Sequence, residues 1–255
     1  MTRRRLVVFA EGSSHTDPRS REPFSRLWSY LFERLGSEFH ASVVGIEKSQ
    51  IVSLNPPPKY YRSREPLDIV IAKEHERRAI DALVVAFDLV PIHDGLNERC
   101  RVRETQKVLE GLAASKRLPT TFSAAASHLI NHYAQRPQRP SRPGGRPSRH
   151  AVEIVVFEPM FESVLVADEA GIKRALGVER RDNRWPSFKR REDYVDRGII
   201  NRATSLAHPS VKRRLQIGFL EGKHAWTHHL LSCLPEHSRC WKHPALTRMK
   251  LLLRD

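Results

Sequence analysis

The sequence has little cysteine and no long apolar run, and each absence excludes a class of protein. Only 3 cysteines occur among 255 residues, too few and too odd a number for the disulfide framework of a small secreted protein. No stretch approaches the roughly 18 apolar residues that a membrane-spanning helix needs. The start, MTRRRLVVFAEG, has too short an apolar run before Glu11 for a secretory signal. We therefore expect a cytoplasmic protein without a membrane partner.

Acidic residues are scarce relative to basic ones. Lys and Arg number 44 against 29 Asp and Glu, so the formal net charge is +15. A positive field of this kind favours polyanions, and clustered Lys and Arg typically bind phosphates in a salt-sensitive way. We therefore expect nucleic acid, DNA or RNA, as a partner. The alternative is that the surplus charge serves only solubility.

Two common catalytic motifs are also missing. Residues 12–14 (GSS) lack the Gly-Lys-Ser/Thr end of a phosphate-binding loop, which argues against ATPase activity in this chain. A Ser-His-Asp triad drawn from residues 13–17 would be too close in sequence to reach triad geometry, and no nucleophile elbow is present. The tail carries four nitrogen or sulfur ligands at a spacing that matches none of the common zinc fingers, so we do not expect zinc. They are Cys233, His237, Cys240 and His243.

Short apolar runs alternate with helical patterns along the chain. Buried strands are predicted at Leu6–Ala10, Ala82–Phe87 and Ala151–Phe157, with a further strand region at Val43–Leu54. Helical spacing predicts helices at Pro23–Gly36, Leu67–Ile80, Arg101–Ser115, Thr121–Tyr133 and Glu158–Ala170. The alternation indicates an α/β fold, with a parallel-rich central sheet covered by helices on both faces. We expect one domain over residues 1–255, in which 171–255 form a mainly helical C-terminal extension.

Two basic segments are candidates for contact with nucleic acid. Gln135–His150 contains five Arg, four Pro and no acid, so we expect a mobile basic loop, either inert or a nucleic-acid-touching arm. In an arm, the contacts would come from Arg139, Arg142 and Arg146. Trp185 stands among basic residues that include Lys189 and Arg190, a mixture that can stack bases and bind phosphates. The alternative for Trp185 is that it covers the edge of the core.

Three of the four strand signals end in a carboxylate. These are Glu11, Asp88 and Glu158. The carboxyl ends of parallel strands share one edge of the sheet, where ligands collect. Several carboxylates at one edge repel each other unless a cation lies among them, and hard oxygen ligands suit Mg²⁺ or Mn²⁺. The sequence therefore predicts a metal site at this edge.

The strand-tip motifs resemble those of TOPRIM domains, the metal-dependent module of topoisomerases, primases and overcoming-lysogenization-defect nucleases. LVVFAEGSSHTD resembles the first motif, and ALVVAFDLVPIHD resembles the strand-plus-Asp motif. AVEIVVFEPMFESVLVAD is similar to a signature of a smaller TOPRIM-like family, the domain of unknown function 4276. The resemblance implies that Asp88 and Glu158 hold the metal and that Glu11 is the general acid–base or a second metal ligand. It implies a metal-dependent nuclease or phosphodiesterase. It is also compatible with a role in bacterial defence and with an ATPase as a partner protein.

The chain departs from the TOPRIM pattern at one position. TOPRIM domains carry Asp-x-Asp after the third strand, whereas here Asp88 is followed by Leu89 and Val90. Asp94 could supply the second acid if its loop folds back, and so could Glu162, one turn along the predicted helix from the acid that ends the fourth strand. The missing acid leaves a second hypothesis, a non-catalytic TOPRIM-like nucleic-acid-binding or structural subunit of a larger complex.

Overall fold

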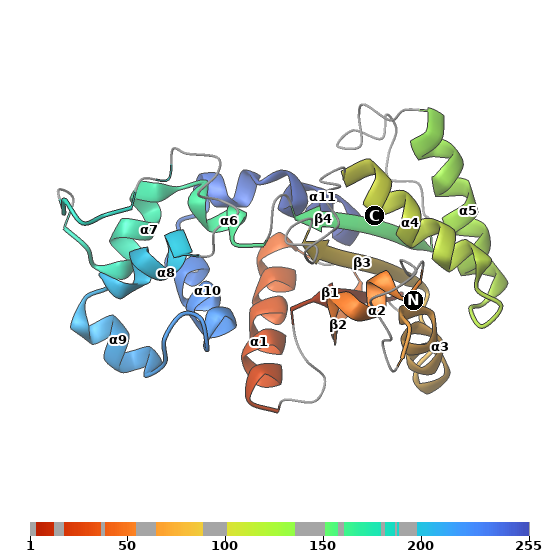
Figure 1. Ribbon diagram of the computed structural model, residues 1–255, viewed down its shortest axis with the longest axis horizontal. Coiled ribbons are helices and arrows are strands. Elements are labelled where there is room, and N and C mark those ends of the chain that lie inside the picture. The colour runs from red at the N-terminus through yellow and green to blue at the C-terminus, as the bar shows by residue number, and fades with distance from the viewer. Residues whose placement is uncertain are drawn as a thin grey trace.

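The computed structural model describes most of the chain and confirms the predicted α/β class. The described residues are 4–12, 18–36, 39–54, 65–88, 101–135, 151–157, 161–179, 182–186, 188 and 198–254. Four strands form a sheet in the order β2-β1-β3-β4, and every neighbouring pair is parallel (Figure 1). The strands are β1 (Arg5–Glu11), β2 (His40–Ile46), β3 (Ala82–Asp88) and β4 (Val152–Phe157).

Helices cover both faces of this sheet. In chain order they are α1 (Pro18–Leu35), α2 (Lys48–Val52), α3 (Leu67–Arg77), α4 (Arg101–Ala114), α5 (Thr120–Gln135), α6 (Ser163–Val166), α7 (Glu169–Leu176), α8 (Gly198–Ser205), α9 (Pro209–Leu215), α10 (Lys223–Ser232), the short 3₁₀ helix η2 (Arg239–Lys242) and α11 (Pro244–Arg254). None of the helices in the described ranges is long and apolar enough to cross a membrane.

Alternation along the strands divides the core into two clusters. Val8, Val84 and Val155 face the cluster that α1, α10 and α11 complete. Phe9 and Val85, one position later on their strands, face the cluster completed by α3, α4 and α5. Side chains on a strand point alternately to opposite faces, so a strand buried on both sides is apolar throughout. This explains why β1 and β3 are unbroken apolar runs and why sequence alone located them.

The helix predicted over Pro23–Gly36 begins earlier, at Pro18, and the one predicted over Leu67–Ile80 ends at Arg77. Two other predicted elements are wrong in more than their ends. The strand region predicted over Val43–Leu54 ends at Ile46, and α2 follows, because Glu47 and Gln50 form a capping box that begins a helix there. The helix predicted over Glu158–Ala170 is divided in its described part. Asp168 accepts a hydrogen bond from the Gly171 amide, and this cap starts α7 separately from α6.

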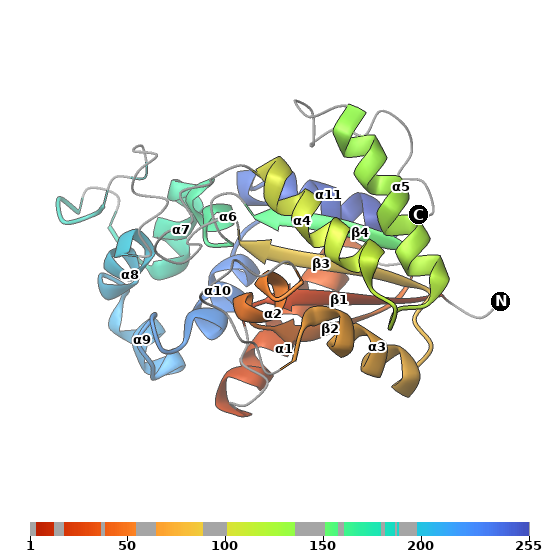
Figure 2. The same ribbon diagram turned by 45° about the vertical axis from the view of Figure 1, so that its right-hand side comes forward.

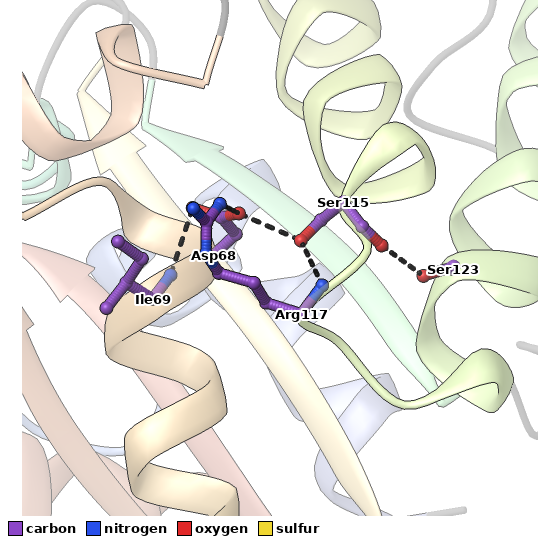
Figure 3. A network of polar contacts seen from close by, with 5 residues as sticks. All are labelled: Asp68, Ile69, Ser115, Arg117 and Ser123. Atoms are coloured by element: carbon purple, nitrogen blue, oxygen red, sulfur yellow. Dashed lines mark hydrogen bonds and ion pairs between the residues drawn. The ribbon is translucent and has the colours of Figure 1, made fainter.

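A polar network far from the strand tips joins α3 to the connection between α4 and α5. The Asp68 carboxylate, at the start of α3, accepts a hydrogen bond from the Ser115 hydroxyl at 2.8 Å and lies 3.4 Å from the Arg117 guanidinium (Figure 3). The Ser123 hydroxyl donates to the Ser115 carbonyl oxygen. Because Asp68 is buried, these partners are needed to compensate for its lost hydration.

The described residues from α7 onward are mainly helical, and this part of the chain returns to the sheet. Leu230 and Leu231 of α10 belong to the same apolar cluster as the residues of β1. On α11, the Arg248 guanidinium lies 2.6 Å from the carboxylate of Glu153, on β4. The last helix is therefore attached to the edge strand of the sheet by a buried ion pair as well as by apolar packing.

Candidate functional site at the carboxyl ends of the strands

The parallel sheet brings the ends of β1 and β3 side by side. Ala10 pairs with Ala86, so Glu11 and Asp88 end neighbouring strands at the same edge. In an open parallel sheet this edge is where ligands bind. Figure 2 shows α6 and α10 lying beyond the carboxyl ends of the strands. The residues just before α6 and the first residues of α10 lie at this edge.

Glu11 is held by two donors. Its Oε2 atom accepts a hydrogen bond from Lys48 Nζ at 3.0 Å and another from the Asp88 backbone amide at 3.0 Å. Lys48 comes from the first turn of α2 and also donates to the Asp88 carbonyl oxygen. Its ammonium lies 5.1 Å from the centre of the Phe87 ring. A positive charge thus lies among the ends of β1 and β3 and fixes the orientation of the Glu11 carboxylate.

Asp88 is buried beside other carboxylates. Its Oδ1 atom accepts a hydrogen bond from the Phe161 amide at 2.8 Å. Burial raises the pKa of Asp88 well above its ordinary value, and the negative charges of Glu11 and Glu162 raise it further. The ammonium groups of Lys223 and Lys48 act in the opposite direction. Raised pKa values of this origin are a feature of functional sites, although structural clusters produce them too.

Glu162 adds a third carboxylate at this edge. It precedes α6, and only 5% of it is exposed. One of its oxygens, Oε2, is buried and has no hydrogen-bond partner among the described residues. A buried carboxylate oxygen without a partner is costly, and a cation is the partner that would compensate for it best.

The start of α10 closes the edge from the far end of the chain. His224 Nε2 lies 2.6 Å from the carbonyl oxygen of Gly12, so this nitrogen carries the proton and donates it. Burial, together with the charge of Lys223, lowers the pKa of His224 to about 4, which keeps the ring neutral at pH 7. Gly12 has a φ of 123°, and a Cβ there would lie 3.3 Å from the His224 ring. Glycine therefore permits this close approach.

The three carboxylates at this edge, Glu11, Asp88 and Glu162, suit a metal ion by their chemistry more than by their arrangement. Within the described ranges, no three His, Cys, Asp or Glu side chains are gathered closely enough to hold one. Alternation explains part of this, because Glu11 follows Val7 and Phe9 on one face while Asp88 follows Val84 and Ala86 on the other. The chemistry of the donors nevertheless fits Mg²⁺ or Mn²⁺, because all three are hard carboxylates and Glu162 has an unpartnered oxygen.

Several predicted site residues lie outside the described residues. They are Glu158, Asp94, Arg139, Arg142, Arg146, Lys189 and Arg190. Trp185 is described and is half buried against the core, with its ring 5.4 Å from that of Phe188 and 4.9 Å from Lys173 Nζ. Its Nε1 atom is buried and has no hydrogen-bond partner among the described residues.

The ligands of the tail do not surround a common point. Cys233 is exposed, whereas Cys240 is buried with its sulfur 3.7 Å from the Leu165 carbonyl oxygen. His243 Nε2 lies 3.0 Å from the Ser163 hydroxyl. Cys240 and His243 connect η2 to α6 instead.

Lys48, Lys223 and His224 were not among the site residues predicted from the sequence. No local motif marks them, because their roles depend on which strands and helices become neighbours in the fold. Comparison of the chain with protein-family models, curated proteins and solved structures finds no match.

Proposed function

We propose that this protein hydrolyses phosphodiester bonds of nucleic acid with a divalent metal ion at the carboxyl ends of β1 and β3. The observation that carries the proposal is the buried Glu162 oxygen without a partner, close enough to Asp88 for the two charges to interact. The net charge of +15 supports a polyanionic substrate. Membership of the TOPRIM-like class, a cytoplasmic location, an ATPase partner and a role in bacterial defence belong to the same proposal and depend on the sequence alone.

In this proposal, Asp88 and Glu162 hold the metal. A bound Mg²⁺ or Mn²⁺ polarises a phosphoryl oxygen and lowers the pKa of a bound water. Glu11, oriented by Lys48 and by the Asp88 amide, accepts a proton from the attacking water. Lys223, at the start of α10, supplies positive charge beside Gly12 and stabilises the charge that develops on the phosphate. The neutral His224 ring holds the Gly12 carbonyl and positions the turn that follows β1.

Cleavage of labelled single- and double-stranded DNA and RNA in Mg²⁺ or Mn²⁺ tests this function. Glu11→Gln, Asp88→Asn and Glu162→Gln should each reduce the rate by about a hundredfold or more, because each removes a metal ligand or the proton acceptor. Asp68→Asn is the matched control, because Asp68 is equally buried but belongs to the network around Ser115. Cleavage that persists in EDTA, or that all four variants retain, would rule the function out.

A second function is favoured by one contact. The Lys48 ammonium already occupies the side of Glu11 that faces β3, so the carboxyl end of the sheet has a resident cation. A TOPRIM-like protein that binds nucleic acid without cutting it would need nothing more. In that case the wild type binds no Mn²⁺ in a calorimetric titration and shows salt-dependent nucleic-acid binding that Asp88→Asn leaves unchanged. Detectable Mn²⁺ binding that Asp88→Asn abolishes would exclude it.

A further inference from the structure

We infer that the segment Pro209–Lys223 is a nucleic-acid docking surface. It comprises α9, the loop that follows it and the first residue of α10. This inference deepens the proposed function and rests on it, because the surface would lead the backbone of the substrate towards Glu11 and Asp88. None of the predicted nucleic-acid-binding residues lies in this segment.

The first observation is unpaired positive charge. Lys212, Arg213 and Arg214 occupy the last turn of α9 and are all exposed. No described carboxylate pairs with Arg213 or Arg214, and the two lie next to each other in the same turn. Arginines that the protein leaves unpaired are free to make forked contacts with phosphate oxygens.

The second observation is exposed aliphatic surface next to this charge. Ile217 is 43% exposed and Leu220 is 60% exposed, and both lie on the loop between α9 and α10. Among the described residues only one other large apolar side chain is as exposed, Leu251 on α11. Aliphatic side chains flanked by arginines can contact or wedge between bases while the arginines bind the backbone.

The loop is held in place rather than left free. Phe219, between the two exposed side chains, is buried in the core. The Trp226 indole N–H donates to the Ile217 carbonyl oxygen at 2.8 Å, and a Cβ at Gly222 would lie only 2.4 Å from Ile217 Cγ2. Gln216 ends α9 with a φ of 54°, a conformation that non-glycine residues rarely adopt. A fixed loop loses little conformational entropy when it binds a partner.

The third observation is continuity with the candidate site. Lys223 ends the segment, and its Nζ atom lies 3.7 Å from the position of a Cβ on Gly12, the residue after Glu11. Figures 1 and 2 show α9 and α10 in the group of helices beyond the carboxyl ends of the strands. Positive charge therefore begins on α9 and recurs at the acidic edge. This continuity favours a polymer of phosphates over a lipid surface or a protein.

Fluorescence anisotropy with labelled single-stranded and duplex DNA and RNA in EDTA tests the surface without any cutting. Arg213→Ala/Arg214→Ala should weaken binding about tenfold or more at about 0.15 M salt. It should also reduce the slope of log affinity against log salt by about 0.7 to 0.9 per arginine. Leu220→Ser should weaken binding about fivefold and leave the slope unchanged, because the lost contact is apolar.

Matched controls remove the same number of positive charges, or the same apolar side chain, elsewhere. Lys73→Ala/Arg77→Ala deletes two exposed charges from α3, on the opposite face of the sheet, and Leu251→Ser removes the third exposed apolar side chain. Both should bind within about twofold of the wild type. Equal weakening by both charge-deleting pairs would overturn the inference, since binding would then follow net charge alone.

Two further outcomes separate this inference from the proposed function. Unchanged binding by Arg213→Ala/Arg214→Ala, together with metal-dependent cutting that Asp88→Asn abolishes, would overturn the surface and leave the hydrolysis standing. Weakened binding by this variant in a protein that never cuts would support the docking surface and rule out the hydrolysis.

A vesicle experiment tests for a membrane instead. Co-flotation with phosphatidylserine vesicles that is lost in Leu220→Ser, while nucleic-acid binding is retained, would assign the surface to membranes and overturn the inference.

Discussion

Replacing Arg248 by Met should destabilise the protein by about 3–5 kcal/mol, because it leaves the buried carboxylate of Glu153 without its partner. Both side chains are nearly inaccessible, with 13% of Arg248 and 5% of Glu153 exposed, and their atoms lie 2.6 Å apart. Solvent therefore screens little of the interaction. Glu153→Met/Arg248→Met, which removes both charges, should lie within about 1 kcal/mol of the wild type or above it.

The loss should also depend on pH. Burial raises the pKa of Glu153 above 4.5 even though the charge and hydrogen bond of Arg248 lower it, so removing Arg248 raises this pKa further. A raised carboxyl pKa means that the folded state binds more protons than the unfolded state over that range. Stability of Arg248→Met should therefore fall more steeply than that of the wild type as the pH rises from about 4.5.

Urea unfolding followed by circular dichroism, at several pH values, measures both effects. Arg26→Met is the matched control, because its partner Glu22 is exposed, and it should change stability by less than about 0.5 kcal/mol. A loss of stability in Arg248→Met as small as that of this control, or one that is the same at every pH, would refute the role given to this ion pair.

Three further predictions concern the acidic edge, the packing of α4 and the start of α7. Asp88→Asn should raise the free energy of unfolding at neutral pH. The wild type loses stability as the pH rises from 3.8 towards the raised pKa of the Asp88 carboxyl, and the variant does not. Equal urea midpoints at neutral pH would contradict this. Gly111→Ala should lower stability by about 1–3 kcal/mol in thermal unfolding, because the added Cβ would lie 2.5 Å from the Leu54 Cβ. An unchanged melting temperature would contradict this and mean that α4 can shift freely. Asp168→Ala should cost about 1–2 kcal/mol, because it removes the acceptor for Gly171 and for the Ser238 hydroxyl. Burial raises the pKa of Asp168, but these hydrogen bonds lower it below 3.8 overall. The deficit should therefore shrink as the pH falls from 3.8 through the lowered pKa, and a deficit that stays constant in acid would refute the assignment.

The strands and the general architecture were predictable because β1 and β3 are buried on both faces. Their apolar runs are short, contain two Val each and end abruptly at Glu11 and Asp88, which favours a buried strand over a buried helix. The α2 helix was not predictable from periodicity, because Ile51 and Val52 continue the β-branched character of β2. Only the capping pair of Glu47 and Gln50 distinguishes this helix from a continued strand. Such a pair indicates a helix start only when the end of the preceding strand is already known.

The strand-tip acids of the candidate site were predictable from the sequence, but the lysine beside them was not. Parallel strands bring their carboxyl ends together, so adjacent strand-tip acids follow from the fold class. The order β2-β1-β3-β4 does not follow from the sequence, and it is this order that brings Lys48, just after β2, beside Glu11 on β1. Because side chains alternate along a strand, Glu11 and Asp88 belong to opposite faces of the sheet. The register of the two strands determines this, and the sequence does not show it.

The hydrogen bond between Gly12 and His224 has a consequence for how the protein is made. A separation of 212 residues divides the two partners in the chain. A ribosome needs about 10 to 40 s to add that many residues. The strand that ends in Glu11 therefore emerges long before the helix that covers its end, and Glu162 emerges between them. Until α10 has been made, the acidic edge lacks its cover, so any activity that depends on Lys223 begins only after this helix has emerged.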